Sequence, residues 1–193
     1  MTELSDYNGV LLQGHIKIHD PENEEVYVDK RNAIHYENIS ISLAESLANQ
    51  GTGWIQDMAF GNGGTNVNET GIITYLTPNS TGTNAGLYNE TFSKIVDDRS
   101  INNLDPVRNK IETRHVSGTN YTDILVTCLL DYGEPAGQSA FDTASSTEDD
   151  FIFDELGLRA YTPSGKGRLL THVIFHPVQK SLNRLIQIDY TVR

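Results

Sequence analysis

The chain has few of the residues that cross-link a fold or fix it to a membrane. Cys128 is its only cysteine, so no disulfide can form within the chain. No apolar run approaches the roughly 18 residues that a membrane-spanning helix needs. The first six residues are acidic and polar and do not have the pattern of a signal peptide. We therefore expect synthesis in a reducing cytoplasm, a fold that does not depend on oxidation, and no membrane partner.

Positive charge is also scarce. The 193 residues include 14 Lys and Arg against 26 Asp and Glu, which leaves a formal net charge of −12. A nucleic-acid-binding protein needs a basic surface to displace counterions from phosphates, and binding to anionic lipid needs one too. The charge balance therefore argues against both kinds of partner, and we expect no nucleic acid ligand.

The apolar content is modest. Hydrophobic residues make up 37% of the chain, somewhat below the usual share of a globular protein. The length fits a single domain over residues 1–193, and a chain of this size can bury about 70% of its unfolded surface. A core is therefore expected, but some faces of the domain should be completed by a neighbouring molecule, including further copies of the same chain.

The N-terminal part predicts a hairpin. Apolar residues at positions 10, 12, 16 and 18 share one parity, which is typical of a half-buried strand. Turn-forming residues at 20–23 separate this strand from a partner that contains Val26 and Val28. We therefore expect a hairpin over residues 9–30.

One helix is expected, over residues 39–49. Its apolar stripe consists of residues spaced at i, i+4 and i+8, namely Ile39, Leu43 and Leu47. Ser42 and Glu45 fit a capping box, although the start could lie one turn earlier. A short helix with one apolar stripe packs over a sheet or at a subunit interface.

Residues 61–91 predict a long loop, or arm. The segment is rich in Asn, Gly and Thr, with one short strand expected at 72–76. The glycines at its start permit a tight reversal, and they do not form a phosphate-binding loop because no Lys-Ser/Thr pair and no helix signal follow. Loops longer than about 15 residues usually serve a function or await a partner. We therefore expect an inter-subunit arm that orders on assembly.

The second half predicts a C-terminal sheet over residues 111–193. Strands are expected at 111–116, 121–132, 169–175 and 185–192, with another beginning at Phe151. The unbroken apolar run at 124–130 suits a central strand that is covered on both faces. With no alternation of strands and helices, the chain predicts an antiparallel β-sandwich-like domain of about eight strands and one helix.

No constellation of residues stands out as catalytic. The histidine pairs His15/His19 and His172/His176 are four residues apart, and on strands such residues lie about 13 Å apart at 3.3 Å per residue, too far to share a zinc ion. Cys128 lies in an apolar run and is expected to be a small core residue. We therefore expect no metal, no cofactor, no catalytic residues and no enzyme activity.

Carboxylates leave two alternatives open. Acidic residues at 97–98, 105, 131, 134 and 148–150 could bind calcium, although none shows the spacing of an EF-hand loop, and the plain alternative is a solvated acidic surface. A glycosidase-like hydrolase needs two carboxylates across a cleft, and nothing in the sequence selects such a pair.

Interface residues are the remaining candidates. Basic residues are concentrated in short stretches, which suits docking against acidic partner surfaces, and tyrosine is the dominant aromatic residue. The selected contact residues are those near the glycine turn, on the arm and in the basic stretch, namely Trp54, Phe60, Tyr75, Tyr88, Arg108 and Arg114.

The order of several short motifs resembles phage tail-fibre and tail-collar proteins. The segment MAFGNGGT at 58–65 resembles their MA-[LF]-G-x-G motif, and LYNE at 87–90 follows a polar stretch as it does there. FDELGL at 153–158 resembles their F-x-E-[IL]-G-[LI] motif. The strand GRLL at 167–170, the bend PVQK at 177–180 and an apolar end strand at 185–190 then follow in the same order.

This resemblance implies a non-enzymatic virion structural protein. The sequence has no shaft repeats and no receptor-binding tip, which favours a compact tail, collar or fibre-attachment component over one that recognises the host. Such a protein would bind other virion proteins and copies of itself. Two alternatives are a capsid decoration protein and a carbohydrate-binding β-sandwich module. A carbohydrate-binding module needs exposed aromatic side chains on one face of a sheet, and the chain has a single tryptophan to offer.

Overall fold

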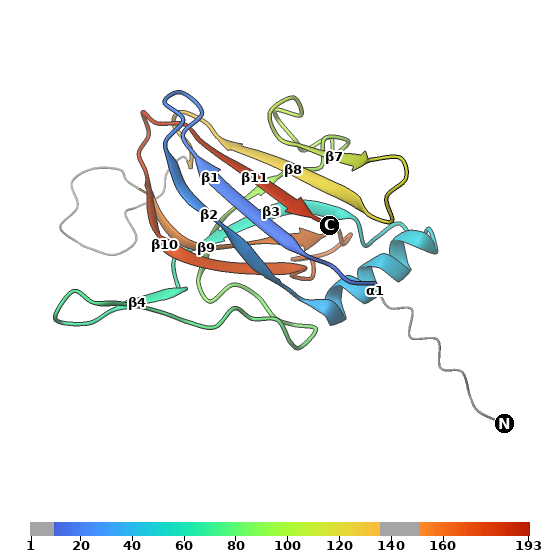
Figure 1. Ribbon diagram of the computed structural model, residues 1–193, viewed down its shortest axis with the longest axis horizontal. Helices are drawn as coiled ribbons and strands as arrows, with labels where there is room; N and C mark the ends of the chain where they lie inside the picture. Colours follow the sequence, from blue (N-terminus) through green and yellow to red (C-terminus); the bar gives the residue numbers. More distant parts are fainter. Residues whose placement is uncertain (1–9, 136–150) are drawn as a thin grey trace.

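The computed structural model describes residues 10–135 and 151–193, and the acidic run at 148–150 lies outside them. The described residues form eleven strands and one helix (Figure 1). In chain order these are β1 (Gly14–His19), β2 (Val26–Ile34), α1 (Tyr36–Leu47), β3 (Ile55–Gly61), β4 (Thr65–Val67), β5 (Ile73–Tyr75), β6 (Glu90–Ile95), β7 (Lys110–His115), β8 (Thr122–Leu130), β9 (Phe151–Ala160), β10 (Thr171–Lys180) and β11 (Ile186–Val192).

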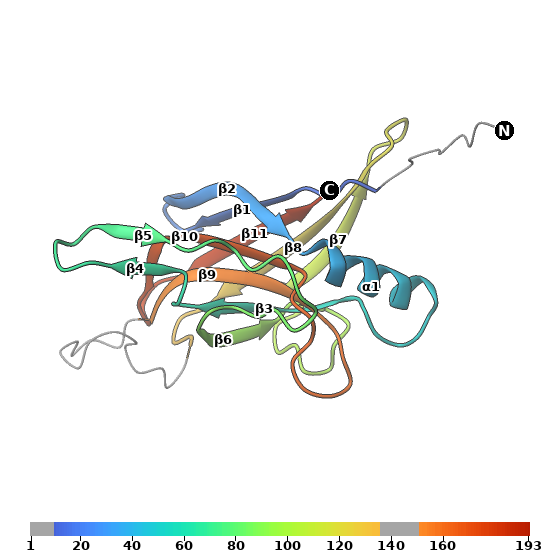
Figure 2. The same cartoon turned by 90° about the horizontal axis from the view of Figure 1, so that it is seen from below.

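Nine strands make one antiparallel sheet in the order β6-β3-β9-β10-β2-β1-β11-β8-β7. The sheet curls so that the half containing β1, β2 and β11 lies over the half containing β3, β6 and β9 (Figure 2). The predicted class, mainly antiparallel β with one helix, is confirmed, with eleven strands in place of about eight. Among the described residues no helix has the length and apolar character needed to cross a membrane.

Alternating side chains build the core between the two halves. In β11 every second residue from Ile186 to Val192 is buried, and β1 buries Ile16 and Ile18 in the same way. The opposite half contributes aromatic residues, and Phe153 makes edge-on contacts with Phe60 and Phe175. Cys128 is fully buried among them, as expected, and burial raises the pKa of its thiol to about 12.

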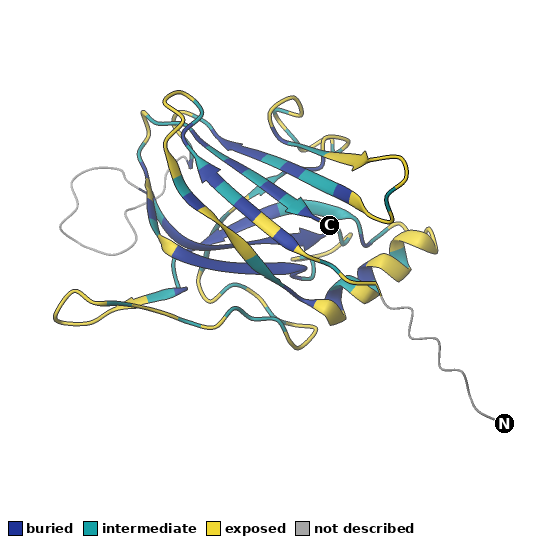
Figure 3. Ribbon diagram, viewed as in Figure 1, coloured by how far each residue is buried: buried dark blue, intermediate teal, exposed yellow. Residues whose placement is uncertain are grey.

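The most deeply buried strand is β9, not the apolar run at 124–130. That run belongs to β8, which lies next to the edge strand β7 and is only half buried along its length. Nine of the ten residues of β9 are buried, as the dark ribbon in Figure 3 shows. Three of these buried residues are charged, Asp154, Glu155 and Arg159, which is why periodicity did not single this strand out.

The helix begins earlier than predicted and turns a different face inward. It starts at Tyr36, and the side chain of His35 caps it by accepting a hydrogen bond from Asn38 N at 3.2 Å, so Ser42 is not the cap. The buried residues of α1 are Asn38 and Ser42. Of the predicted stripe, Ile39 packs against the core, whereas Leu43 and Leu47 are 46% and 80% exposed, so the stripe is only partly buried among the described residues.

Candidate interaction site

The arm at 61–91 contains a two-stranded ribbon, β4 with β5, and is attached to the sheet by a group of polar side chains that we call the anchor: Asp154 and Glu155 of β9, and His172 of β10. One strand was expected in this arm and two are present. Hydrogen bonds within this chain hold the arm at both ends and in its middle, and its ordering on assembly stays a prediction.

Glu155 binds both ends of the arm. Its Oε1 accepts hydrogen bonds from Gly63 N at 3.1 Å and Asn89 N at 2.8 Å. Its Oε2 accepts from Tyr88 N at 3.0 Å. Glu155 therefore takes backbone donors from residues 25 or more positions apart in the arm and closes it into a loop over β9.

Asp154 fixes the base of the ribbon. Its Oδ1 accepts from Gly64 N at 2.9 Å, and its Oδ2 accepts from Thr65 N at 2.8 Å and from the Thr65 hydroxyl. The glycine is required here because a Cβ on Gly64 would lie 2.9 Å from Ile174 Cγ2 and 3.1 Å from Asp154 Oδ1. The backbone N–H groups of the glycine-rich turn thus bind a carboxylate of the same chain, that of Asp154.

Two buried histidines hold the middle of the arm. His172 accepts from Asn79 N at its Nδ1, at 2.8 Å, which leaves Nε2 to donate to Glu155 Oε2 at 2.9 Å. His35 accepts from Asn38 N, and its Nε2 donates to Gly82 O at 3.0 Å. In both rings Nδ1 accepts from a backbone N–H and Nε2 donates, so both rings act as connectors between the sheet and the arm.

The anchor is closed to solvent. Glu155 and His172 are fully buried, and each has its hydrogen-bonding atoms occupied by the arm or by the other. Burial favours the neutral form of Glu155, but the hydrogen bonds from His172 and three backbone donors outweigh it and hold the pKa of Glu155 below its ordinary value. For Asp154 burial dominates and raises the pKa. This carboxylate–imidazole pair is a structural connection with no access for a substrate.

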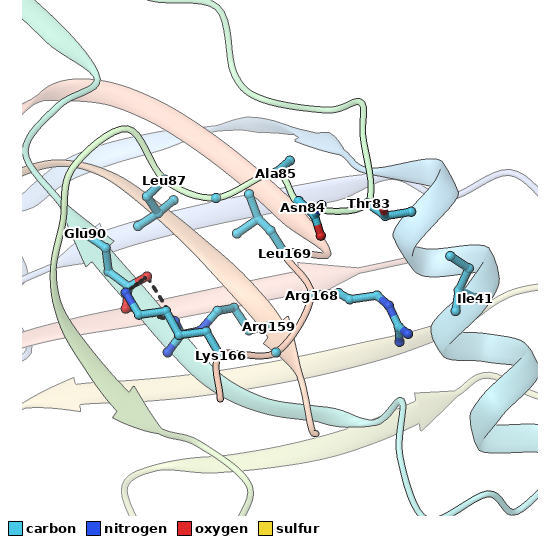
Figure 4. Close-up of a pocket in the computed structure, with 12 residues that line it drawn as sticks. Ile41, Thr83, Asn84, Ala85, Leu87, Glu90, Arg159, Lys166, Arg168 and Leu169 are labelled. Atoms are coloured by element: carbon cyan, nitrogen blue, oxygen red, sulfur yellow. Dashed lines mark hydrogen bonds and ion pairs between the residues drawn. The ribbon is translucent and has the colours of Figure 1, made fainter. Parts of the chain in front are cut away.

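A polar cavity lies between the arm, α1 and the β9–β10 turn (Figure 4). Its volume is about 500 Å³. Its cations are matched by carboxylates: Arg159 binds Glu90 at 2.8 Å and also binds Asp57, Lys166 reaches Glu90 at 3.2 Å, and Arg168 binds Glu45 at 2.9 Å. The cavity is therefore charge-balanced within the chain and offers no free cation to an anionic ligand.

A second feature is the segment between β6 and β7, which we call the knob loop (residues 97–109). Asn103 donates to Asp97 O at 3.1 Å and to Asn109 O at 2.8 Å, so its side chain ties the two ends of the loop together. Arg108 bridges Asp105 and Asp131, and Asn109 accepts from Leu129 N at 2.9 Å. The loop is therefore held in one shape against β8.

This rigid loop exposes aliphatic side chains. Ile101 is 96% exposed, Leu104 98% and Val107 77%. Single exposed apolar residues are common, but three in one short loop leave more aliphatic surface in water than scattered residues do, as at protein–protein contacts. None of the three was selected from the sequence, because a lone aliphatic residue in a polar loop has no periodicity.

The residues selected from the sequence fall in different places. Trp54 is half buried, stacks on Tyr161 with ring centroids 4.4 Å apart, and donates from Nε1 to Asp97 at 2.9 Å. It therefore supports the knob loop through Asp97. Phe60 is fully buried and packs against Phe92 and Phe153, so selecting it as a contact residue was wrong: it has no surface to present.

The other four are accessible. Tyr75 and Tyr88 are 54% and 44% exposed on the arm, and the Tyr88 hydroxyl donates to Thr77 O at 2.7 Å. Arg108 lies in the knob loop, where its charge is taken by two aspartates. Arg114 is exposed on the edge strand β7, opposite Asp123 of β8. The structure thus places both tyrosines on the arm, Tyr75 beside His176 and Tyr88 beside His172, and leaves the two arginines elsewhere.

The histidine pairs do not form a metal site in the described part of the chain. His15 pairs with Asp29 at 2.8 Å and His19 with Asp189 at 2.9 Å. His172 is buried, whereas His176 is exposed and lies 3.3 Å from the Tyr75 hydroxyl. Across residues 10–135 and 151–193, no group of three or more His, Cys, Asp or Glu side chains is placed to hold a metal ion.

Sequence reasoning missed the anchor. In the sequence, Asp154 and Glu155 are part of the FDELGL motif, and His172 is one half of a histidine pair. One signal was available: two adjacent acids inside an otherwise apolar strand are costly to bury unless donors meet them. Comparison with known proteins gives no further identification, because no family model, curated protein or solved structure matches this chain.

Proposed function

We propose that this protein is a non-enzymatic phage virion component, a tail, collar or fibre-attachment adaptor that acts through protein–protein interfaces. One observation carries the proposal. The segments that resemble tail-fibre and tail-collar proteins meet at the anchor: residues 63–65 and 88–89 donate to the Asp154–Glu155 pair of the FDELGL motif, and His172 completes it. Motifs that are far apart in sequence thus bind one another in the fold, and this supports treating them as one family pattern.

The distribution of polar and apolar groups also supports an assembly role. The buried ionisable groups of the anchor form hydrogen bonds that attach the arm to the sheet. In the polar cavity, each cationic side chain is paired with a carboxylate of the same chain. The surface instead offers rigid apolar features, the knob loop and the outer side of α1, where Leu47 is 80% exposed. A protein that works by docking needs such surfaces held in place before its partner arrives.

The test is the protein content of purified phage particles, measured by quantitative mass spectrometry against the major capsid protein. We expect the chain in intact particles at a low, fixed copy number that follows tail symmetry. A copy number that follows the capsid lattice would mean that the protein is a capsid decoration protein and not an adaptor. Presence in infected cells with absence from every particle fraction would overturn a virion role altogether.

A further inference from the structure

The strand β7 is an open edge of the large sheet. It pairs with β8 on one side, and no strand of the described residues pairs with it on the other. Its residues from Glu112 to His115 are all exposed, as the yellow ribbon in Figure 3 shows. The opposite edge strand, β6, is mostly half buried, and its Lys94 reaches Leu129 O at 2.7 Å. β7 is therefore the edge that a further strand can reach.

Hydrogen bonds inside the sheet show which residues of β7 turn their backbone groups toward the open edge. Leu129 N of β8 donates to Asn109 Oδ1, just before β7, so the odd-numbered residues of β8 face β7. The paired backbone bonds beside β1 and β11 give the same alternation. Because the odd-numbered residues of β8 lie opposite the even-numbered residues of β7, the latter bond to β8. The backbone N–H and C=O groups that face the edge belong to Ile111, Thr113 and His115.

We propose that β7 pairs with β7 of a second copy of this chain, antiparallel and centred on Thr113, so that the two sheets continue as one across a two-fold axis. This inference rests on the proposed assembly function and names one partner for it. In this register Thr113 lies opposite Thr113 of the second copy, and Ile111 lies opposite His115. All of these residues have backbone groups that face the edge, so the pairing forms about six backbone hydrogen bonds.

The side chains of β7 select this register. Opposite residues of an antiparallel pair share a face, so under a two-fold axis even-numbered residues meet even-numbered ones. With the axis at Thr113, Glu112 of each copy lies opposite Arg114 of the other. Centring the pair on Glu112 or on Arg114 sets that charge against its own copy. Centring it on Ile111 would require pairing by Asn109, which is fully buried.

Unpaired charge on the edge favours a second copy as the partner. Asp123, which lies opposite Arg114 in β8, binds Arg193 at 2.7 Å, so Arg114 has no ion pair within the part of the chain that the structure describes. A strand that completes this edge needs an anion opposite Arg114 and, two residues on, a cation opposite Glu112. β7 read in the reverse direction has this pattern. Charged side chains often keep edge strands from pairing, and on β7 they oppose the neighbouring registers and permit this one.

The pairing closes on itself and is small. A two-fold contact uses the β7 edge of both copies, so it leaves no β7 edge for a third chain. One pair of strands buries less than the roughly 1,200 Å² of a stable interface, so we expect a weak dimer in solution, half associated at about 0.1 mM. In a particle, neighbouring copies are held close together, which raises their effective concentration.

The first experiment tests the register by disulfide cross-linking with copper phenanthroline. In a bonded antiparallel pair the two Cα atoms lie about 5.5 Å apart, within the range that a disulfide spans, so Thr113→Cys should give a covalent dimer. Lys110→Cys is the matched control on the same strand. Its two copies would lie six residues apart along the strands, about 20 Å, so it should cross-link at least about tenfold more slowly. Cys128 is buried and should not react.

The second experiment measures mass by light scattering and sedimentation equilibrium up to about 1 mM. We expect the wild type to approach twice its chain mass of 21.4 kDa and to stop there. Arg114→Glu sets carboxylates against each other twice and should weaken association by about tenfold, whereas Arg114→Glu combined with Glu112→Arg restores opposite charges and should regain it. Arg31→Glu, at an exposed arginine of β2, changes the net charge equally and should dimerise like wild type.

Circular dichroism checks that all variants are folded. A wild type that stays monomeric up to about 1 mM overturns the pairing, and this is also the result if another segment of the chain covers the edge. Equal cross-linking rates of the two cysteine variants overturn the register, as does a dimer that Arg114→Glu does not weaken. Masses that grow beyond the dimer overturn the two-fold arrangement. None of these results removes the chain from the virion, which the particle analysis measures separately, so a failure here is distinguishable from a failure of the proposed function.

Discussion

The charged side chains in the interior can be buried because each of them binds oppositely charged or hydrogen-bonding groups of the same chain. Arg159 is buried and binds Asp57 through two nitrogens, at 2.8 and 2.7 Å, and Glu90 through a third. Glu155 is fully buried and accepts from three backbone N–H groups and one imidazole. Removing one member of such a set leaves donors or acceptors buried without partners, which costs more than the set contributes when intact.

Glu155→Gln tests this directly. The amide nitrogen would face donors that need an acceptor, so we expect a loss of about 3–5 kcal/mol in the free energy of unfolding, measured by chemical denaturation at neutral pH. Because the folded pKa of Glu155 is lowered, its contribution is present above the unfolded value of 4.5 and is lost as pH falls through the folded value. The difference from wild type should therefore narrow in acid.

The control is Glu112→Gln on β7, where an exposed carboxylate pairs with Lys110 at 3.0 Å. Exposed pairs contribute about 0–1 kcal/mol, so this variant should remain close to wild type. If the two variants lose the same stability, the anchor is not the structural connection described above.

Lys180 gives a second prediction, in alkaline solution. Its ammonium group is buried against Asp131 O at 3.0 Å and Ser181 O at 2.9 Å, and burial lowers its pKa from 10.5 to about 8. Between these pH values the unfolded chain binds more protons, so this group raises the free energy of unfolding as pH rises, by up to about 3 kcal/mol. The buried Cys128 thiol, with a raised pKa of about 12, acts in the opposite direction above pH 9.

The measurement is therefore a difference between two proteins. Unfolding free energies of wild type and Lys180→Met are followed from pH 7 to 10.5, and the variant should lack the rising component while retaining the Cys128 component. Lys166→Met, at a lysine that is 71% exposed, leaves Lys180 in place and should follow wild type. Parallel curves for wild type and Lys180→Met would contradict the assignment.

At the scale of elements, the sequence predicted the strands whose burial alternates locally. The hairpin of β1 and β2 and the end strand β11 follow period-two patterns, and each was expected where it lies. The deep burial of β9 was not predicted, because it depends on backbone N–H donors to Glu155 that lie 66–92 residues away along the chain. The helix start was misplaced because its cap is a histidine, His35, which is not among the usual capping residues.

The arm shows the same limit. Its Asn, Gly and Thr content predicted a loop, and only the fold brings Asp154 beneath Gly64 and Thr65. An isolated two-stranded ribbon is marginal in water, so β4 and β5 depend on this attachment. The interface candidates were the least predictable, because exposure of Leu104 or burial of Phe60 is a property of the assembled sheet.

Asp154→Asn tests the attachment of the ribbon. The amide nitrogen would oppose a backbone donor, so we expect the amides between Gly64 and Tyr75 to exchange at least about tenfold faster with deuterated water, while those of β10 keep their rates. Glu69→Gln, at an exposed position in the turn of the ribbon, should leave the exchange pattern unchanged. Equal acceleration in β10 would mean that the ribbon does not open separately from the sheet.

At the scale of the whole molecule, the first and the last described strands pair with each other in one sheet. β11 pairs with β1 on one side and with β8 on the other, while β9 and β10 pair with β3 and β2 from the first half. Neither half of the sequence can therefore complete its own set of strands. Since the two halves of the sheet also share one core, we expect a single cooperative unfolding transition.

Ile188→Asp tests this cooperativity from a distance. Ile188 is fully buried in β11, in register with Ile18 and Cys128, and a buried unpaired carboxylate there should cost about 4 kcal/mol or more. Trp54, the only tryptophan, lies beside β3 in the opposite half and reports through its fluorescence. In one cooperative unit, the tryptophan signal and the far-ultraviolet circular dichroism move together to lower denaturant concentration.

Gln187→Thr, at the neighbouring position of the same strand, should change the free energy of unfolding from either signal by no more than about 1 kcal/mol. A tryptophan transition that stays at its wild-type midpoint while the circular dichroism shifts would divide the sheet into two units that unfold independently.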